Sequence, residues 1–278
     1  RRIGMTPSWM AGSLRKRIYG FIIRRAAAVV AVAETAARQL VDEFGVPSSS
    51  IELIGNAVDE QRVRSSADPQ DVKRRLHLDE EAPAVLFAGA LTDEKNPLEL
   101  IEIERRVRAV LPRVSFLIAG DGPLAGDLDS AVSGAGVRIK VLGSRSDLPD
   151  LMRACAAVVM TSRTEGIPGV AIEAGLSRRP VVAYGVGGLP EVVTHGHTGL
   201  LAPHGDAHAL SDLLIQVLND PTEAKALGER AQARCRELYG IEASGRLYLD
   251  LYNRLGNETE QSPLMKRDPD ITLTGEPR

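Results

Sequence analysis

Apolar and polar positions follow two different rhythms along this chain. From residue 83 onward, short continuous apolar runs alternate with stretches in which apolar residues recur every three or four positions. Continuous runs are typical of strands buried on both faces, and the spaced pattern is typical of amphipathic helices. Their alternation predicts an α/β fold: a Rossmann-like parallel sheet with helices on both faces. The expected strands are 85–88, 114–119, 139–142, 157–160 and 181–183, and the expected helices are 97–110, 124–132, 148–154 and 169–177.

The two ends of the chain have patterns of their own. Residues 14–23 and 34–44 read as helices, and residues 26–33 and 51–54 as strands, so the first 55 residues predict a truncated piece of a second Rossmann-like domain. Residues 206–256 look entirely helical. Residues 257–278 are polar with three prolines and no apolar period, which predicts a disordered tail.

Composition excludes several classes of protein. The chain carries 34 basic and 37 acidic residues, a formal net charge of -3, so bulk charge does not indicate nucleic-acid binding. Two cysteines cannot form a multi-bridge framework and fit a reducing compartment. No run approaches the roughly 20 apolar residues of a membrane-spanning helix. The chain starts at Arg1 without a signal-peptide pattern, from which we expect a fragment or a processed chain.

Glycines at the ends of the expected strands mark the face where a ligand would bind. Gly89, Gly120 and Gly143 each follow an apolar run directly. Ligands of parallel α/β sheets bind beyond the carboxyl ends of the strands, where glycine lets them approach the backbone. We therefore expect the functional site among these loops.

The segment that follows the expected strand 157–160 is the most informative. Glu165 and Glu173 are eight residues apart, and Gly166 to Gly169 open a helix between them. A helix start presents free N–H groups and a positive dipole end, which favour an anion such as phosphate. Carboxylates on both sides of an anion site suit a ligand with phosphates and hydroxyls, such as a nucleotide sugar. The alternative is that both are ordinary surface carboxylates.

Two further loops lie on the same predicted face. Lys95, in the loop after strand 85–88, could place a cation at a diphosphate, although a solvated lysine paired with Glu94 is the simpler interpretation. Residues 185–191 and 120–123 are glycine-rich turns that could contact a ligand or serve only as tight turns.

Seven short motifs together resemble those of a known family. In order and spacing they are similar to the carboxyl-terminal half of GT-B-fold, retaining glycosyltransferases of family four, the glycosyl transferases group 1, over about residues 15–256. The motifs are Asn56-Ala57-Val58-Asp59, Gly89 with Glu94-Lys95, Gly120-Asp121-Gly122-Pro123, Ser162 with Glu165-Gly166 and Glu173 (E-x7-E), Arg179-Pro180-Val181-Val182, Gly187 to Val193, and Thr198-Gly199-Leu200-Leu201.

The resemblance implies roles for particular residues. Lys95 would bind the donor diphosphate, Glu165 would face the donor sugar as the catalytic residue, and Glu173 would accept hydrogen bonds from the ribose. Backbone amides of one turn would hold sugar and phosphate, and a loop after strand 139–142 would lie near the base. That turn consists of Gly166, Ile167, Pro168 and Gly169, and the loop near the base contains Ser144 and Arg145.

The resemblance also implies an activity and a division into domains. The chain would transfer a hexose from a nucleotide sugar, with UDP- or GDP-sugars expected first, and with retention of configuration. It would use no cofactor and no metal, act on a sugar, lipid-linked or small-molecule acceptor, and serve glycan, glycolipid or polysaccharide biosynthesis. The division is 1–55 for the end of the acceptor domain, 56–236 for the donor domain, 237–256 for a helix that crosses back, and 257–278 for the tail.

Departures from the family pattern leave alternatives open. Ala90 stands where the family usually has an arginine, and most of the acceptor domain is missing. Arg163 or Arg145 could compensate for the lost cation. A non-catalytic nucleotide-sugar-binding fragment or pseudoenzyme is therefore one alternative, and a GT-B-fold sugar-nucleotide epimerase is another.

The remaining features concern metals and membranes. His204 and His208 are four residues apart, a spacing that could hold a metal on one helix face. The resemblance places His195 and His197 in a variable loop and His204 in a turn, so we expect no metal site. The first 30 residues carry seven basic and no acidic side chains, mixed with apolar ones. This pattern fits either a peripheral membrane contact or a helix of an incomplete domain, and we prefer the second. The expected location is cytoplasmic, with the inner face of the membrane as the variant.

Overall fold

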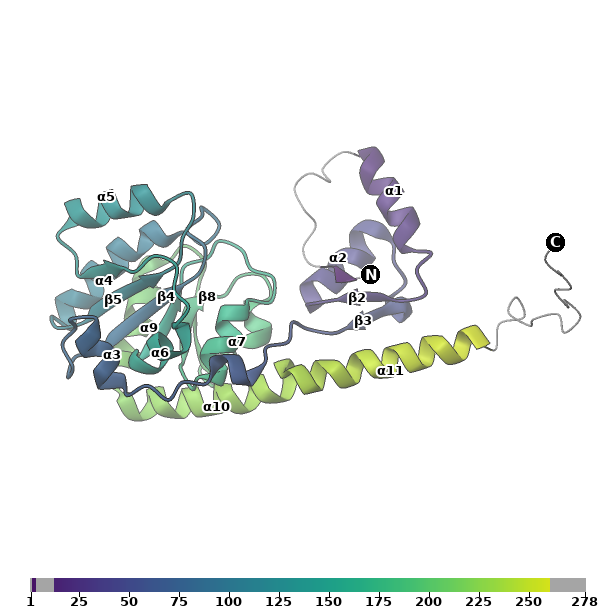
Figure 1. Cartoon of the computed structure of the whole chain (residues 1–278). Helices are drawn as coiled ribbons and strands as arrows, with labels where there is room; N and C mark the ends of the chain where they lie inside the picture. Colours follow the sequence, from purple (N-terminus) through teal and green to yellow (C-terminus); the bar gives the residue numbers. More distant parts are fainter. Residues whose placement is uncertain (1, 4–12, 261–278) are drawn as a thin grey trace, which may run out of the picture.

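Within residues 2–3 and 13–260, which the computed structural model describes, six strands form a parallel sheet in the order β6-β5-β4-β7-β8-β9 (Figure 1). The predicted α/β fold class is confirmed, and the five expected strands lie within a few residues of their predicted bounds. The sixth, β9, was not expected. The strands are β4 Ala84–Ala88, β5 Ser115–Ala119, β6 Ile139–Val141, β7 Ala157–Met160, β8 Val181–Tyr184 and β9 Gly199–Ala202.

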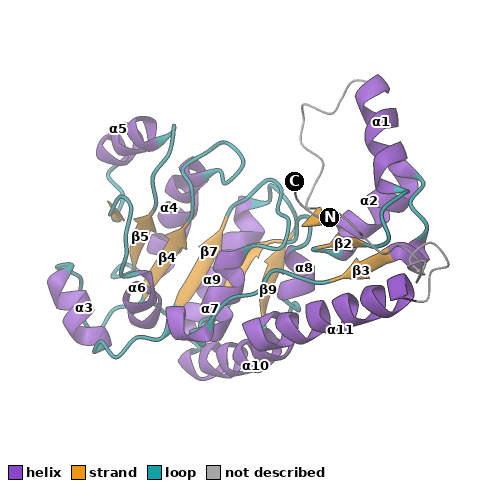
Figure 2. Cartoon of the chain, turned by 45° about the vertical axis from the view of Figure 1, so that its right-hand side comes forward, coloured by secondary structure: helices purple, strands orange, loops and turns teal. Residues whose placement is uncertain are grey.

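Helices cover both faces of this sheet, because successive residues of each buried strand point to opposite sides. In β4, Leu86 joins one apolar cluster and Phe87 joins the other. The first cluster also contains residues of α6 Leu148–Ala154, α7 Gly169–Leu176 and α10 Pro221–Tyr239. The second contains residues of α4 Leu100–Val110, α5 Ala125–Ala135 and α9 Ala207–Asn219. Figure 2 shows the two helical layers with the sheet between them.

Several short elements complete the larger unit. Helices α3 Pro69–Arg75 and α8 Leu189–Val192 and the 3-10 turns η3 Glu60–Val63 and η4 Pro97–Glu99 lie between the longer elements. The predicted helix 97–110 therefore begins as a 3-10 turn and becomes α4 at Leu100. Helix α3 was not expected, because Val72 is its one buried residue.

A smaller unit precedes the sheet. Its described strands, β1 Arg2–Ile3, β2 Val29–Ala31 and β3 Ile51–Leu53, are parallel in the order β1-β2-β3. Helices α1 Ser13–Ile23 and α2 Glu34–Phe44 confirm the predicted helices, and η2 Ser48–Ser50 leads into β3. Strand β2 is shorter than the apolar run 26–33, since Ala26 to Ala28 precede it as a partly exposed turn.

Helix α11 Ile241–Glu260 follows α10 and runs beneath the smaller unit (Figure 1). Leu251 of α11 packs against Val30 and Ile54, and Arg254 pairs with Glu52 at 2.7 Å. The expected helix 237–256 is thus divided by Gly240, which ends α10. The tail was expected to begin at residue 257, and this boundary is corrected, because α11 continues through Glu260. Residues 261–278 lie outside the described residues.

The two units touch at a helix end. Helix α2 has no side-chain cap of its own, and the Glu191 carboxylate of α8 accepts hydrogen bonds from the backbone N–H groups of Glu34 at 2.9 Å and Thr35 at 3.3 Å. A negative charge at a helix N-terminus is favourable. The Tyr239 hydroxyl donates to the carbonyl oxygen of Glu191 at 3.0 Å. Residues of both units also share one apolar cluster.

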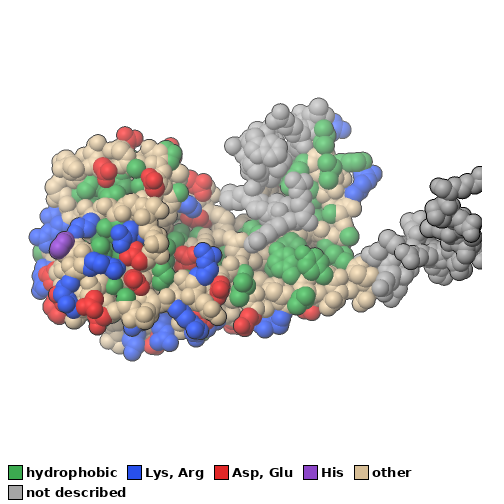
Figure 3. All heavy atoms as spheres, in the orientation of Figure 1, with side chains coloured by type: hydrophobic (Ala, Val, Ile, Leu, Met, Phe, Trp, Pro, Cys, Tyr) green, Lys and Arg blue, Asp and Glu red, His purple; other side chains and the backbone are tan. Residues whose placement is uncertain are grey.

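Apolar side chains are exposed on the smaller unit and on α11. Ile18, Phe21 and Ile22 of α1 are each more than half exposed, as are Leu249 and Tyr252 of α11. Figure 3 shows hydrophobic surface on this part of the molecule, whereas charged side chains of both signs cover the larger unit. None of the described helices combines the length and the apolar character needed to cross a bilayer.

Candidate functional site

Lys95 and Glu165 meet at the carboxyl edge of the sheet. Lys95 lies in the loop after β4 and Glu165 in the loop after β7, and these two strands are hydrogen-bonded neighbours. The Lys95 Nζ lies 2.7 Å from Oε1 and 2.8 Å from Oε2 of Glu165. The Glu165 side chain is only 4% exposed, whereas that of Lys95 is 27% exposed. The structure therefore brings together the two residues predicted for the donor diphosphate and the donor sugar.

Neighbouring groups fix the position of Glu165. The Ser162 hydroxyl donates to Oε1 of Glu165 at 2.6 Å, and the Gly188 N–H donates to the Glu165 carbonyl at 3.0 Å. A Cβ at Gly187, whose φ is +55°, would lie 1.9 Å from that same carbonyl oxygen. The glycine-rich loop after β8 thus packs directly against the backbone of the Glu165 loop, which explains why it lacks side chains here.

Gly166 to Gly169 present backbone rather than side chains. Ile167 and Pro168 are buried, and the Asn56 side-chain amide donates to the Ile167 carbonyl at 2.8 Å. A Cβ at Gly166 or Gly169 would meet nothing within 4 Å. Among the described residues no side chain caps α7, whose N-cap is Pro168. Free backbone N–H groups at the start of a helix are a ready site for an anion.

Glu173 lies on α7, one turn inside the helix. Its side chain is partly buried, and burial raises the pKa of its carboxyl above the usual range, against a smaller opposing effect of Arg62. No described residue donates a hydrogen bond to it. A partly buried carboxylate without a donor is unfavourable unless a ligand supplies one, which fits an acceptor for ligand hydroxyls.

Ala90 stands at the position where the family usually has an arginine. Ala90 is exposed in the loop after β4. Of the two cations that could compensate, Arg163 is exposed, and its backbone N–H donates to the Glu94 carbonyl at 2.8 Å, which places its loop beside Lys95. None of the ion pairs among the described residues includes Arg163, although its charge lowers the pKa of Glu99 against the larger effect of burial.

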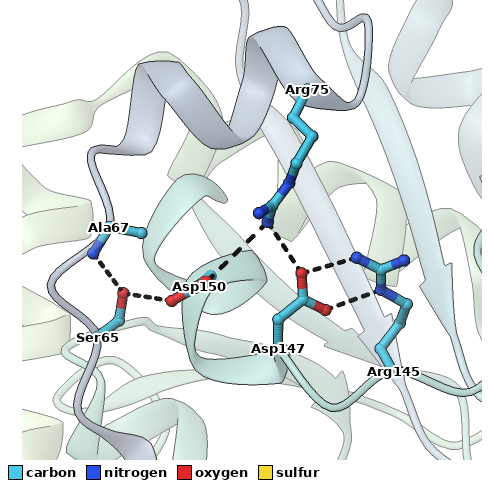
Figure 4. A network of polar contacts seen from close by, with 6 residues as sticks. All are labelled: Ser65, Ala67, Arg75, Arg145, Asp147 and Asp150. Atoms are coloured by element: carbon cyan, nitrogen blue, oxygen red, sulfur yellow. Dashed lines mark hydrogen bonds and ion pairs between the residues drawn. The ribbon is translucent and has the colours of Figure 1, made fainter.

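Arg145 is held elsewhere. Its guanidinium donates to both carboxylate oxygens of Asp147, at 2.8 and 2.7 Å, and Arg75 also donates to Asp147 at 2.9 Å (Figure 4). The Arg145 hydrogen bond holds the pKa of Asp147 below its usual range. Ser144 and Arg145 follow β6, which β5 separates from β4, so the structure does not bring them into contact with the Lys95–Glu165 pair. Their role near a base stays a prediction.

Two residues that hold this site were missed as site residues. Ser162 and Asn56 both belong to motifs quoted above, yet neither received a role. The S-x-x-E spacing could have indicated the Ser162 contact. The Asn56 contact spans 111 residues of sequence and left no local signal. In the described part of the chain, no group of three or more His, Cys, Asp or Glu side chains could hold a metal ion.

The comparison with protein families decides the classification. Residues 68–234 match the model described as "Glycosyl transferases group 1", which is more than half of the chain, and residues 4–62 match "Glycosyltransferase Family 4". The chain belongs to the glycosyl transferases group 1 family. Membership of the glycosyl transferases group 1, expected from the seven motifs, is confirmed.

Curated relatives of this group 1 glycosyltransferase chain are longer than it is. The 2-deoxystreptamine glucosyltransferase of Streptomyces kanamyceticus is 30% identical over 243 residues, which are 85% of this chain and 63% of that protein. The D-inositol 3-phosphate glycosyltransferase of a Nocardioides species is 30% identical over 263 residues, 87% of this chain and 56% of that protein. The chain thus spans less than two thirds of the length of these relatives.

Solved structures share the fold of the group 1 chain. Anabaena Alr3699/HepE in complex with UDP superposes with a TM-score of 0.81 at 24% identity, over 92% of this chain and 71% of that one. The same protein in complex with UDP-glucose gives a TM-score of 0.78 over 91% and 71%. These likenesses confirm the GT-B architecture expected from the sequence.

Proposed function

We propose that this chain is the donor-binding half of a retaining hexosyltransferase that uses a nucleotide sugar. The observation that carries the proposal is the Lys95–Glu165 pair, with Nζ to Oε1 at 2.7 Å, beside the uncapped start of α7. One cation for a diphosphate, one buried carboxylate for sugar hydroxyls and one free helix N-terminus lie within adjoining loops of the same sheet edge.

The geometry suggests how a donor would lie. The diphosphate takes the Lys95 ammonium and the N–H groups of the first turn of α7, whose positive end favours negative charge. The donor sugar lies toward Glu165, and the ribose hydroxyls donate to Glu173. As the glycosidic bond breaks, negative charge grows on the leaving phosphate, and fixed cations and backbone dipoles stabilise that charge most.

Retention of configuration belongs to the proposal as the family resemblance implies it. The acceptor hydroxyl attacks from the side on which the diphosphate departs, and the departing phosphate oxygen takes the proton. Glu165, buried and held by Ser162 and Lys95, orients the reacting sugar rather than moving this proton. Arg163 supplies the second cation in place of the arginine that Ala90 replaces.

We infer a UDP-sugar as the first donor to test. Support comes from Alr3699/HepE, whose solved structures contain UDP and UDP-glucose, and from the relative named as a 2-deoxystreptamine glucosyltransferase. GDP-sugars are the second choice, because another relative is named as a GDP-mannose-dependent mannosyltransferase. The 2-deoxystreptamine and D-inositol 3-phosphate in the names of two relatives favour a small polyol acceptor, whereas the phosphatidylinositol mannoside in the name of the mannosyltransferase favours a lipid-linked one.

Calorimetry of the chain with UDP-glucose, GDP-mannose and ADP-glucose tests the donor proposal. We expect binding of one base, weakened at least about tenfold in Lys95→Met because a charge-assisted contact to phosphate is lost. Arg246→Met, which removes an exposed cation on α11, is the matched control and should bind normally. Binding of none of the three nucleotide sugars, or equal binding by Lys95→Met, would contradict the proposal.

Ala90 favours a second candidate, a nucleotide-sugar-binding chain without transferase activity. The loss of a bidentate phosphate contact weakens stabilisation of the leaving group more than ground-state binding. Donor binding without hydrolysis or transfer of the sugar, in the presence of polyol acceptors, would favour this candidate. Sugar transfer by the chain would exclude it.

A further inference from the structure

A cavity lies at the opposite edge of the larger sheet from the proposed donor site. It has a volume of about 890 Å³, within the usual range for small-molecule sites, and none of the predicted donor residues lines it. Its walls include Arg153 and Ala156, which precede β7, and Arg179, which precedes β8. Parallel strands start at this edge, so the length of the strands separates the cavity from Lys95 and Glu165.

The cavity is lined by an excess of positive charge. Arg64, Arg153, Arg178 and Arg179 all line it, and none of the four belongs to an ion pair among the described residues. The two carboxylates of the wall are already engaged: Glu60 pairs with Arg236, and Glu229 lies 3.9 Å from Lys225. The charges of Arg64 and Arg178 also lower the pKa of Glu60, although less than its hydrogen bond with Arg236 does. Four guanidinium groups from three segments of the chain thus line one cavity whose two carboxylates do not balance their charge.

Arg178 occupies a backbone conformation that an arginine adopts only at a cost. Its φ is +58°, in the left-handed region where glycine is free of strain. Helix α10 presses on the same segment, since a Cβ at Gly228 would lie 2.2 Å from the Arg178 carbonyl oxygen. The Arg178 Nε donates to the Gln232 side chain of α10 at 2.9 Å, which fixes the guanidinium at the cavity wall. This conformation ends α7, because the Arg178 N–H donates to the Gly175 carbonyl at 2.9 Å and the Arg179 N–H donates to the Ala174 carbonyl at 2.8 Å. The end of the helix thus places both arginines at the cavity wall.

Arg179 has a buried donor without an acceptor. Its Nη2 donates to the Arg153 carbonyl at 3.0 Å, but its Nε is buried and has no hydrogen-bond partner. Burial lowers the pKa of Arg179; Cys155 opposes this with a smaller effect, and the charge of Arg153 lowers the pKa by a smaller amount again. The cation is thus electrostatically unfavourable in the unliganded protein, and a bound anion would remove that penalty.

We propose that this cavity is a second ligand site, which takes a small molecule that carries a phosphate group. Planar guanidinium groups match phosphate oxygens in geometry as well as in charge. The concave wall favours a small molecule over an extended polyanion, and its apolar lining, which includes Val63, Leu176 and Pro149, would contact the rest of that molecule.

The cavity also touches the connection between the two units. Residues 63–66 of its wall belong to the segment that leads from the smaller unit into α3. The Ser65 hydroxyl anchors that segment by donating to Asp150 of α6 at 2.7 Å, and it accepts from the Ala67 N–H at 3.2 Å (Figure 4). A ligand in the cavity would therefore contact this segment and α6 together.

Titration with inorganic pyrophosphate, followed by calorimetry, tests the proposal. Since pyrophosphate also resembles the donor diphosphate, the titration is run on the Lys95→Met chain as well. We expect binding to persist in Lys95→Met and to weaken at least about tenfold in Arg178→Gly and in Arg153→Ala. Arg246→Ala, an exposed cation on α11, is the control for net charge and should leave the affinity unchanged.

Arg178→Gly keeps the test independent of folding. Glycine adopts the left-handed conformation without strain, so this variant should unfold at the same or a higher temperature than the parent chain. Absence of pyrophosphate binding, loss of binding in Lys95→Met, or unchanged affinity in both arginine variants would each overturn the proposal. UDP-glucose binding should be unchanged in Arg178→Gly. Failure of the second-site proposal can therefore be distinguished from failure of the proposed donor site.

Discussion

The Lys95 ammonium contacts both carboxylate oxygens of Glu165, at 2.7 and 2.8 Å, and so joins the loops after β4 and β7. An ammonium has three donors, and Glu165 takes two of them. A diphosphate at Lys95 would thus share this cation with Glu165 instead of meeting a free one. Because Glu165 also accepts from Ser162, it keeps a partner when Lys95 turns toward a phosphate.

Removal of Lys95 alone should destabilise the chain. Lys95→Met leaves the buried Glu165 carboxylate with the Ser162 hydroxyl as its remaining side-chain donor, and an uncompensated buried charge is costly. We expect a loss of roughly 1–3 kcal/mol in the free energy of unfolding by urea. The double variant Lys95→Met/Glu165→Gln should recover part of this loss. Additive effects would show that the two side chains do not interact.

Glu173→Gln should separate stability from binding. Burial raises the pKa of Glu173 in the folded chain, so the folded state holds this proton more tightly than the unfolded state. The contribution of Glu173 to stability therefore falls as pH rises from its unfolded pKa of about 4.5 through the folded pKa, and stays low above it. At neutral pH the glutamine variant should unfold at a higher temperature than the parent chain yet bind nucleotide more weakly. Lower thermal stability at pH 7 would contradict the burial argument, and unchanged nucleotide affinity would remove the ribose role.

Ala90→Arg should strengthen the donor site. Ala90 is exposed in the loop that carries Lys95, so an arginine side chain fits without repacking. A new charge-assisted contact to phosphate is expected to tighten UDP binding by about tenfold, measured by calorimetry at low salt. Ala109→Arg, at an exposed position of α4, adds the same charge away from the site and should have little effect. Equal gains in both variants would indicate a general charge effect.

Two glycines of the site should respond in opposite ways to alanine. Gly166→Ala adds a methyl group with no atom within 4 Å, so folding should be unchanged while donor affinity falls because the ligand loses close access to the backbone. Gly187→Ala forces a Cβ to within 1.9 Å of the Glu165 carbonyl oxygen at a φ of +55°. Thermal unfolding of the Gly187 variant should occur at a clearly lower temperature. Equal melting temperatures for the two variants would show that the packing of the two loops matters little.

The sequence predicted the larger sheet well because its strands are buried on both faces. Strand β7 reads as four consecutive apolar residues, and all four are buried. Strand β9 was missed because Gly199–Ala202 is short, begins with glycine and resembles a turn. Helix α3 was missed because its polar side chains face solvent, although Asp68 and Pro69 carry ordinary signals for a helix start.

The sequence predicted that the candidate residues Lys95 and Glu165 lie at the same edge of the sheet, but it did not predict their contacts. The strand order places the Lys95 and Glu165 loops side by side, which the rule for the carboxyl ends of parallel strands anticipates. Their ion pair, the Ser162 hydroxyl and the Asn56 amide depend on side-chain positions that no local pattern encodes. The sequence did not predict the cavity at the other edge of the sheet for the same reason, since its arginines come from three separate segments of the chain.

The N-terminal cap of helix α2 is supplied by the larger unit. Its own flanking residue, Ala33, offers no side-chain acceptor, and the Glu191 carboxylate serves instead. The cap on the first turn of α2 therefore depends on the relative orientation of the two units. Any rotation of the units that moves α8 away would leave two N–H groups of α2 without an acceptor in the protein. Loss of this contact would therefore weaken the first turn of α2.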